Sequence, residues 1–124
     1  MPEIRPSTEV DLLRQAYEAF NRRDFETVLN LMHTDVDWPN GWEGGHVHGR
    51  DAVRSYWKRQ FEVLDSTVEP QAFTTEADGR IAIRIHQVVH DKFGALLADQ
   101  VVEHVYEIRG SLIASMEIRN QPQN

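Results

Sequence analysis

Polar side chains fall at positions where two strand-like segments of the chain should be apolar. Between residues 101 and 109, alternating residue types place His104 and Tyr106 in an otherwise apolar register, and between residues 81 and 89 the same holds for Gln87. Strand residues two apart share a face, so all three side chains point to the interior. Buried imidazole, phenol and carboxamide groups need hydrogen-bond partners or a polar ligand. The sequence therefore predicts an internal pocket for a small molecule.

These three side chains are suited to acid–base chemistry. A neutral histidine near its unperturbed pKa is the usual general acid or base at physiological pH, which makes His104 the candidate proton-transfer group. Tyr106 could donate a hydrogen bond to a carbonyl or enolate-like oxygen, and Gln87 could orient His104 or hold a substrate carbonyl. His104, Tyr106 and Gln87 are thus the candidate catalytic residues. In the alternative interpretation, His104 is a core histidine that is hydrogen-bonded to Tyr106 or Gln87 and takes no part in chemistry. Gln87 is then a half-exposed polar residue that closes the mouth of the pocket.

Large apolar and aromatic side chains supply candidate walls for this pocket. Trp38, Trp57 and Met116 would form a polarizable surface of the kind that binds flat hydrophobic ligands, and Tyr17 joins them from the apolar face of the first expected helix. Aromatic residues at core spacing are also common core residues. We expect Trp57 to belong mainly to the core and Trp38 to the pocket.

No motif in the sequence indicates a metal or a nucleotide cofactor. His46 and His48 form a His-x-His pattern that Glu43 or His33 could complete as a ligand set, but this spacing is a weak signal, and we expect no metal. The glycine-rich segment 41–45 lacks the lysine and the spacing of a phosphate-binding loop. The dinucleotide fingerprint and the Gly-x-Ser-x-Gly elbow are also missing from the sequence. We therefore expect chemistry without a cofactor.

Composition narrows the class of protein. The 124 residues suit a single domain, 1–124, and the net charge of −7 disfavours binding to nucleic acid or to anionic membrane surfaces. The chain has no cysteine, which excludes thiol catalysis, disulfides and thiolate metal sites. With no signal-like or membrane-spanning apolar run, we expect a soluble cytoplasmic domain.

Helical patterns occupy the first half of the chain and strand patterns the second. Apolar spacing predicts helices over about 8–22, 25–32 and 51–64, with Thr8 and Asp24 as caps, a short strand at 34–38 and a loop at 41–49. Glycine-containing turns separate four further strands, at about 67–76, 80–91, 96–109 and 112–120. This order indicates an α+β domain with helices on one side of a curved sheet.

Short sequence segments, together with this order of helices and strands, resemble a known family. They are Ala19-Phe20-Asn21 through Asp24-Phe25, His33 to Trp38, His48 to Val53, and His104-Val105-Tyr106 running into Gly110. The chain resembles the SnoaL-like branch of the nuclear transport factor 2-like superfamily, which includes relatives of polyketide cyclases and ketosteroid isomerases. The resemblance implies a cone-shaped, curved antiparallel sheet wrapped around three N-terminal helices, a pocket between them, and a homodimer formed through the outer sheet.

The chain departs from the ketosteroid isomerase pattern within that superfamily. Those enzymes use a tyrosine on the first helix, a carboxylate base at the end of the first strand and a protonated carboxylic acid on a later strand. The matching positions here are Ala16, Trp38 and His104, and none keeps the group. Asp37, beside Trp38, should face the other side of its strand. Steroid isomerisation by that mechanism is therefore not expected.

Two functions follow from these patterns. The first is a SnoaL-like domain that binds a small, largely apolar molecule and performs cofactor-independent acid–base chemistry of the isomerase, dehydratase or cyclase type. The second is a non-catalytic ligand-binding or protein-interaction domain of the same fold, because this scaffold hosts both enzymes and binding domains.

Overall fold

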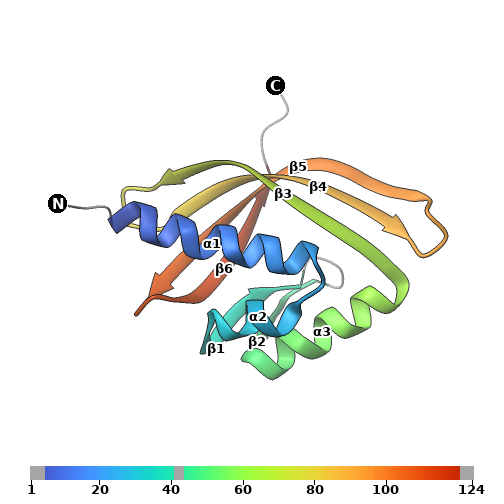
Figure 1. The fold of residues 1–124 in the computed structure, drawn as a ribbon, viewed down its shortest axis with the longest axis horizontal. Helices are drawn as coiled ribbons and strands as arrows, with labels where there is room; N and C mark the ends of the chain where they lie inside the picture. The colour runs from blue at the N-terminus through green and yellow to red at the C-terminus, as the bar shows by residue number, and fades with distance from the viewer. Residues whose placement is uncertain (1–4, 41–43, 121–124) are drawn as a thin grey trace.

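A computed structural model describes residues 5–40 and 44–120 of the chain and shows an α+β domain. The helices are α1 (Arg5–Asn21), α2 (Phe25–Asn30) and α3 (Arg50–Val63), and the strands are β1 (Met32–Pro39), β2 (His46–His48), β3 (Leu64–Thr75), β4 (Ile81–Asp91), β5 (Leu96–Arg109) and β6 (Leu112–Asn120). The strands form one six-stranded sheet in the order β2-β1-β6-β5-β4-β3. The sheet is curved and does not close, and α1 lies under the arch of β3, β4 and β5 (Figure 1). The expected fold class is confirmed.

The sheet is mixed and not antiparallel throughout. β1 pairs with β6 in parallel, with Met32 beside Ile113 and Asp37 beside Ser115. The other neighbouring pairs of described strands are antiparallel. The expectation of a wholly antiparallel sheet is wrong at this junction, because the alternation that predicts a strand says nothing about the direction of its neighbour.

Two predicted local signals are confirmed at the ends of elements. Asp24 is the N-cap of α2, and its carboxylate accepts hydrogen bonds from the Thr27 backbone N–H at 3.3 Å and from the Thr27 hydroxyl at 2.7 Å. The β5–β6 hairpin turns on Gly110 and Ser111, whose φ angles of 60° and 67° suit the two central positions of a type I′ turn. The cap and the turn fix where these elements begin and end.

Some boundaries differ from the sequence expectations. α1 begins at Arg5, so Thr8 lies inside the helix and is not its cap. α2 is shorter than expected, and Met32 opens β1. Residues 46–48 form β2 within the expected loop, because they pair with the end of β1. A three-residue strand depends on its partner, and its own sequence carries too little pattern to reveal it.

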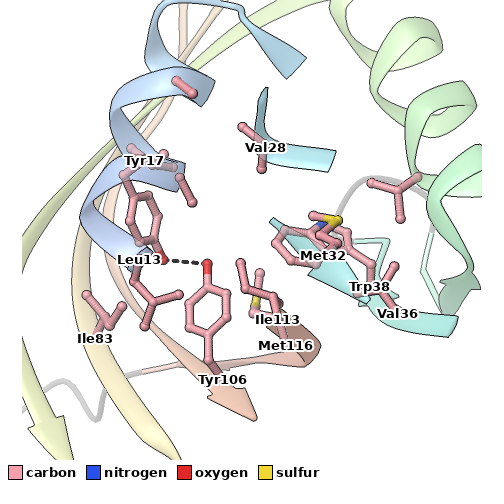
Figure 2. Close-up of a cluster of buried hydrophobic side chains, with 14 of the residues drawn as sticks. Leu13, Tyr17, Val28, Met32, Val36, Trp38, Ile83, Tyr106, Ile113 and Met116 are labelled. Atoms are coloured by element: carbon pink, nitrogen blue, oxygen red, sulfur yellow. Dashed lines mark hydrogen bonds between the residues drawn. The ribbon is translucent and has the colours of Figure 1, made fainter. Parts of the chain in front are cut away.

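The core fills the space between the helices and the concave face of the sheet. Leu13 of α1 and Ile83 of β4 lie to one side of Tyr17, and Val36 and Trp38 of β1 lie across the interior (Figure 2). All five side chains are buried. None of the helices in the described part of the chain is long and apolar enough to cross a membrane.

Candidate functional site

A cavity of about 800 Å³ lies between the concave face of the sheet and helices α1 and α3. Its wall includes all seven residues that the sequence singled out, namely Tyr17, Trp38, Trp57, Gln87, His104, Tyr106 and Met116. The structure thus brings the predicted residues to one internal surface, and their roles in binding or catalysis stay predictions.

The strand register aims two of these residues inward. On β5, His104 is paired with Ile83 of β4, and Tyr106 is paired with Ile81 of β4 and with Met116 of β6. His104 is 6% exposed and Tyr106 is 2% exposed. The predicted inward direction of both side chains is therefore confirmed.

The hydroxyl of Tyr17 joins these two residues into one hydrogen-bonded chain. Its oxygen lies 2.8 Å from Nδ1 of His104 and 2.7 Å from the hydroxyl oxygen of Tyr106. Figure 2 shows the two tyrosine hydroxyls meeting. The expected partners of His104 were Tyr106 or Gln87, and that expectation is wrong. The partner is Tyr17, because α1 turns its buried face toward the middle of β5.

The hydrogen-bonded residues His104, Tyr17 and Tyr106 have two proton arrangements in which Tyr17 donates, since its single hydroxyl hydrogen can serve only one neighbour. In the first, Nδ1–H of His104 donates to Tyr17 and Tyr17 donates to Tyr106. This leaves the Tyr106 O–H without an acceptor and Nε2 of His104 with a free lone pair. In the second, Tyr106 donates to Tyr17 and Tyr17 donates to Nδ1, which leaves Nε2–H as the free donor. Either way, the described residues leave one buried donor for a ligand oxygen.

Burial disfavours the charged forms of all three hydrogen-bonded side chains. It lowers the pKa of His104 from the ordinary 6.5 to about 4. It raises the pKa of both tyrosines above the ordinary 10.0, and for Tyr17 the proximity of Tyr106 raises it further. The expectation of a histidine near its unperturbed pKa is therefore wrong. The cause is desolvation, because the buried imidazole bonds to a neutral phenol and is flanked in the sheet by Ile83 and Ile118.

Gln87 lines the cavity away from His104. Its Nε2 donates to the Ser66 hydroxyl at 3.2 Å, and its Oε1 accepts from Nε2 of Gln100 at 3.0 Å. It sits four positions along β4 from Ile83, the strand partner of His104, which is roughly 13 Å of strand. The expected contact between Gln87 and His104 is absent. Its half-buried position matches the alternative interpretation, although Gln87 lies in the middle of β4 and not near its end.

Among the members of the cavity wall that sequence reasoning missed are two polar residues that bond to Gln87, Ser66 and Gln100. Gln100 could have been found, because it continues the inward register of Val102 and His104 along β5. Ser66 fell between the expected end of a helix and the expected start of a strand. β3 in fact begins at Leu64, directly after α3, which places Ser66 on the inward face.

The two tryptophans contribute differently to the aromatic wall. The ring of Trp57 packs against Phe20 and Phe25, with centroid distances of 5.3 and 5.2 Å, and against Trp38 at 5.7 Å. Trp38 in turn lies 6.2 Å from the ring of Tyr106. Trp57 therefore belongs to both the core and the wall, and Trp38 connects that cluster to the hydrogen-bonded chain.

The His-x-His pattern lies on β2 beside β1. Nδ1 of His46 and Nδ1 of His48 are 3.2 and 3.5 Å from the same oxygen of Asp37. Glu43, a possible further ligand, lies outside the described residues. Among the residues that are described, no group of three or more histidine, aspartate or glutamate side chains is arranged to hold a metal ion. Both imidazoles of the pattern therefore contact one carboxylate.

Solved structures share this fold. The chain is similar to an NTF2-like protein from Burkholderia pseudomallei, with 24% identity, a TM-score of 0.80 and coverage of 92% of this chain and 91% of that chain. It is similar to TerC, co-crystallised with polyporic acid, at 24% identity and a TM-score of 0.80, with 92% of each chain covered. SalBIII, an epoxide hydrolase/cyclase-like enzyme in pyran ring formation in polyether salinomycin, is 15% identical with a TM-score of 0.80, covering 94% of this chain and 93% of that chain. These likenesses establish the fold.

No curated protein sequence matches the chain. The family model described as the SnoaL-like domain matches residues 13–116, which span α1 to β6 and include every member of the hydrogen-bonded chain. The resemblance carried by the short sequence segments is thereby confirmed, and the chain belongs to the SnoaL-like domain family.

Proposed function

We propose that the cavity binds a small, largely apolar carbonyl compound and that the protein catalyses proton transfer on it without a cofactor, as in an isomerase, dehydratase or cyclase. The observation that carries this proposal is the uncharged chain of His104, Tyr17 and Tyr106 on the cavity wall. Most of the remaining wall is apolar, as is typical of small-molecule sites. The enzyme-like relative SalBIII supports a catalytic use of the same scaffold.

The three hydrogen-bonded side chains His104, Tyr17 and Tyr106 can move protons without creating an ion. In their first arrangement, Nε2 of His104 takes a proton from the carbon beside the carbonyl group while Nδ1–H passes to the Tyr17 oxygen. The Tyr17 proton moves to Tyr106, and the Tyr106 proton moves to the carbonyl oxygen. A C–H bond breaks and an O–H bond forms, so the ketone becomes its enol and the chain ends in its second arrangement. Return of a proton to a different carbon completes an isomerisation.

This relay is consistent with the electrostatics of the site. Desolvation penalises both an imidazolium and a phenolate in the cavity. A base with a pKa of about 4 is weak when it must become charged, but in the relay His104 loses one proton as it gains another. Burial therefore favours a concerted neutral transfer over a stepwise ionic one.

The test is hydrogen exchange at carbon. Cyclic ketones such as 1-indanone and 1-tetralone are incubated with the protein in deuterium oxide, and deuterium at the α-carbon is followed by NMR. We expect acceleration over buffer and a loss of roughly 10²- to 10⁴-fold in Tyr17→Phe, which keeps the ring but breaks the relay. His104→Gln should lose the same activity, whereas His86→Gln, on the outer face of β4, should retain it. Unchanged exchange in folded Tyr17→Phe would rule out the relay.

A non-catalytic binding domain is the second candidate, and the scarcity of carboxylates on the cavity wall favours it. Glu117 is the one carboxylate among the described lining residues, and it is half-exposed and lies 3.4 Å from Arg80. Thermal stabilisation by the ketones with no exchange of their α-hydrogens would select this function over the enzyme.

A further inference from the structure

We infer that the ligand carries a second oxygen function, which is bound by Ser66, Gln87 and Gln100 about four strand residues away from His104. This inference rests on the proposed binding of an apolar molecule in the cavity and specifies its chemical class. The three side chains come from adjacent strands β3, β4 and β5, and all three line the same cavity as His104.

The Ser66–Gln87–Gln100 cluster is a directed row of hydrogen bonds. Gln100 donates to Gln87 at 3.0 Å, and Gln87 donates to the hydroxyl of Ser66 at 3.2 Å. Ser66 is 3% exposed, and within the described part of the chain its own hydroxyl hydrogen has no acceptor. A buried hydroxyl donor without an acceptor is costly, so it favours a ligand that supplies one.

The backbone around Ser66 is held in place. Arg23 donates to the carbonyl oxygen of Ser66 at 2.7 Å. The side-chain amide of Asn21 donates to the carbonyl oxygen of Val68 at 2.7 Å and accepts from its N–H at 3.0 Å. These bonds tie the free edge of β3 to the end of α1. Because the strand is fixed, the hydroxyl is a preorganised contact.

Apolar surface separates the two polar ends of the cavity. Along β5, Val102 is the one inward residue between Gln100 and His104, and its partner on β4 is the buried Ile85. Four residues of strand separate Gln100 from His104, or roughly 13 Å. The complementary ligand is a rigid, apolar body with a hydroxyl or carbonyl group at each end. Gln100 is exposed and bonded to Gln87, so a ligand whose one oxygen binds at His104 would leave the buried hydroxyl of Ser66 as the donor without an acceptor among the described residues.

The experiment compares rigid phenols that differ by one hydroxyl. The probes are 4-hydroxy-p-terphenyl and p-terphenyl-4,4″-diol, with 4-hydroxybiphenyl and biphenyl-4,4′-diol as a shorter pair, and binding is measured by titration calorimetry. We expect the wild type to bind the terphenyl diol about three- to tenfold more tightly than the mono-ol, which is the contribution of about one net hydrogen bond. The shorter pair should show a smaller preference.

Variants test whether the preference for the diol over the mono-ol comes from the Ser66–Gln87–Gln100 cluster. Gln87→Leu and Ser66→Ala should each abolish the preference for the diol over the mono-ol. Gln87→Met, closer in shape, serves if Gln87→Leu does not fold. His86→Leu, the next residue but on the outer face of β4, should retain the preference.

The outcomes separate this inference from the function on which it rests. If the mono-ol and the diol bind equally well to the wild type, the second polar end is overturned and the apolar pocket stands. If the diol preference persists in Ser66→Ala and in both Gln87 variants, another group holds the second oxygen and the inference is likewise overturned. If none of the four phenols binds, both the inference and the proposed pocket are overturned.

Discussion

The hydroxyl oxygen of Tyr17 lies 2.8 Å from Nδ1 of His104, and this bond connects residues 87 positions apart in the chain. It fixes α1 against the middle of β5 and sets the tautomeric choice of the imidazole. The same hydroxyl lies 2.7 Å from the hydroxyl oxygen of Tyr106, so one helical side chain controls the protonation pattern of both His104 and Tyr106.

The buried His104 should make the stability of the protein depend on pH. Its pKa is about 4 in the folded state and near 6.5 when unfolded, so between these values the unfolded state binds the extra proton. The free energy of unfolding should therefore fall as pH drops from 6.5 toward 4, by up to about 3 kcal/mol from this group. Urea unfolding at pH 7 and at pH 4.5 measures the effect.

His104→Gln is the matched variant for that measurement, because it removes the titrating group and keeps a polar side chain. Its stability should fall less than that of the wild type between pH 7 and pH 4.5. Parallel pH curves for the two proteins would show that His104 titrates normally in the folded state, against the burial seen here.

The same shifted pKa determines the pH dependence of exchange activity. A relay that forms no ion should give a constant rate across neutral pH, and protonation of His104 should stop it only as pH approaches 4. Deuterium exchange from 1-indanone, measured from pH 4.5 to pH 9 over the range where the protein stays folded, tests this. An inflection between pH 6 and 7 would instead indicate an imidazole exposed to solvent when the ligand is bound.

The hydrogen-bonded chain should respond to mutation as a unit. Tyr17→Phe leaves both His104 and Tyr106 without their partner, which should cost about 1–3 kcal/mol of stability. In the double variant Tyr17→Phe with Tyr106→Phe, the second substitution removes a hydroxyl that is already unpaired. The double variant should therefore be more stable than the sum of the single effects predicts, as measured by a double-mutant cycle in urea. Strict additivity would mean that the two hydroxyls do not interact.

The local pattern of apolar and polar residues was enough to predict the helices and strands and which side chains face inward. It was not enough to predict which of those side chains contact one another. The alternation along β5 correctly placed His104 and Tyr106 in the interior. The bond from Tyr17 could not be predicted, because it depends on the rotation and position of α1 over the sheet. The contact of Gln87 with Ser66 depends on the register of the β3–β4 hairpin, which shifts at a bulge near Pro70. Register and helix docking are set by tertiary packing, which the alternation of residues leaves undetermined.

Truncation of each tryptophan should show that Trp57 contributes mainly to stability and that Trp38 contributes mainly to ligand binding. Trp57 is 2% exposed and packs on three aromatic rings, so Trp57→Ala should cost about 3–5 kcal/mol of stability. Trp38 is 9% exposed and its ring lies beside that of Tyr106 on the cavity wall, so Trp38→Ala should cost less stability and weaken the binding of 4-hydroxy-p-terphenyl more. Urea unfolding and calorimetric titration of the two variants measure both effects. If Trp38→Ala binds the phenol as tightly as the wild type does, Trp38 is not part of the ligand's surface, and the apolar body must lie against the helices α1 and α3 instead.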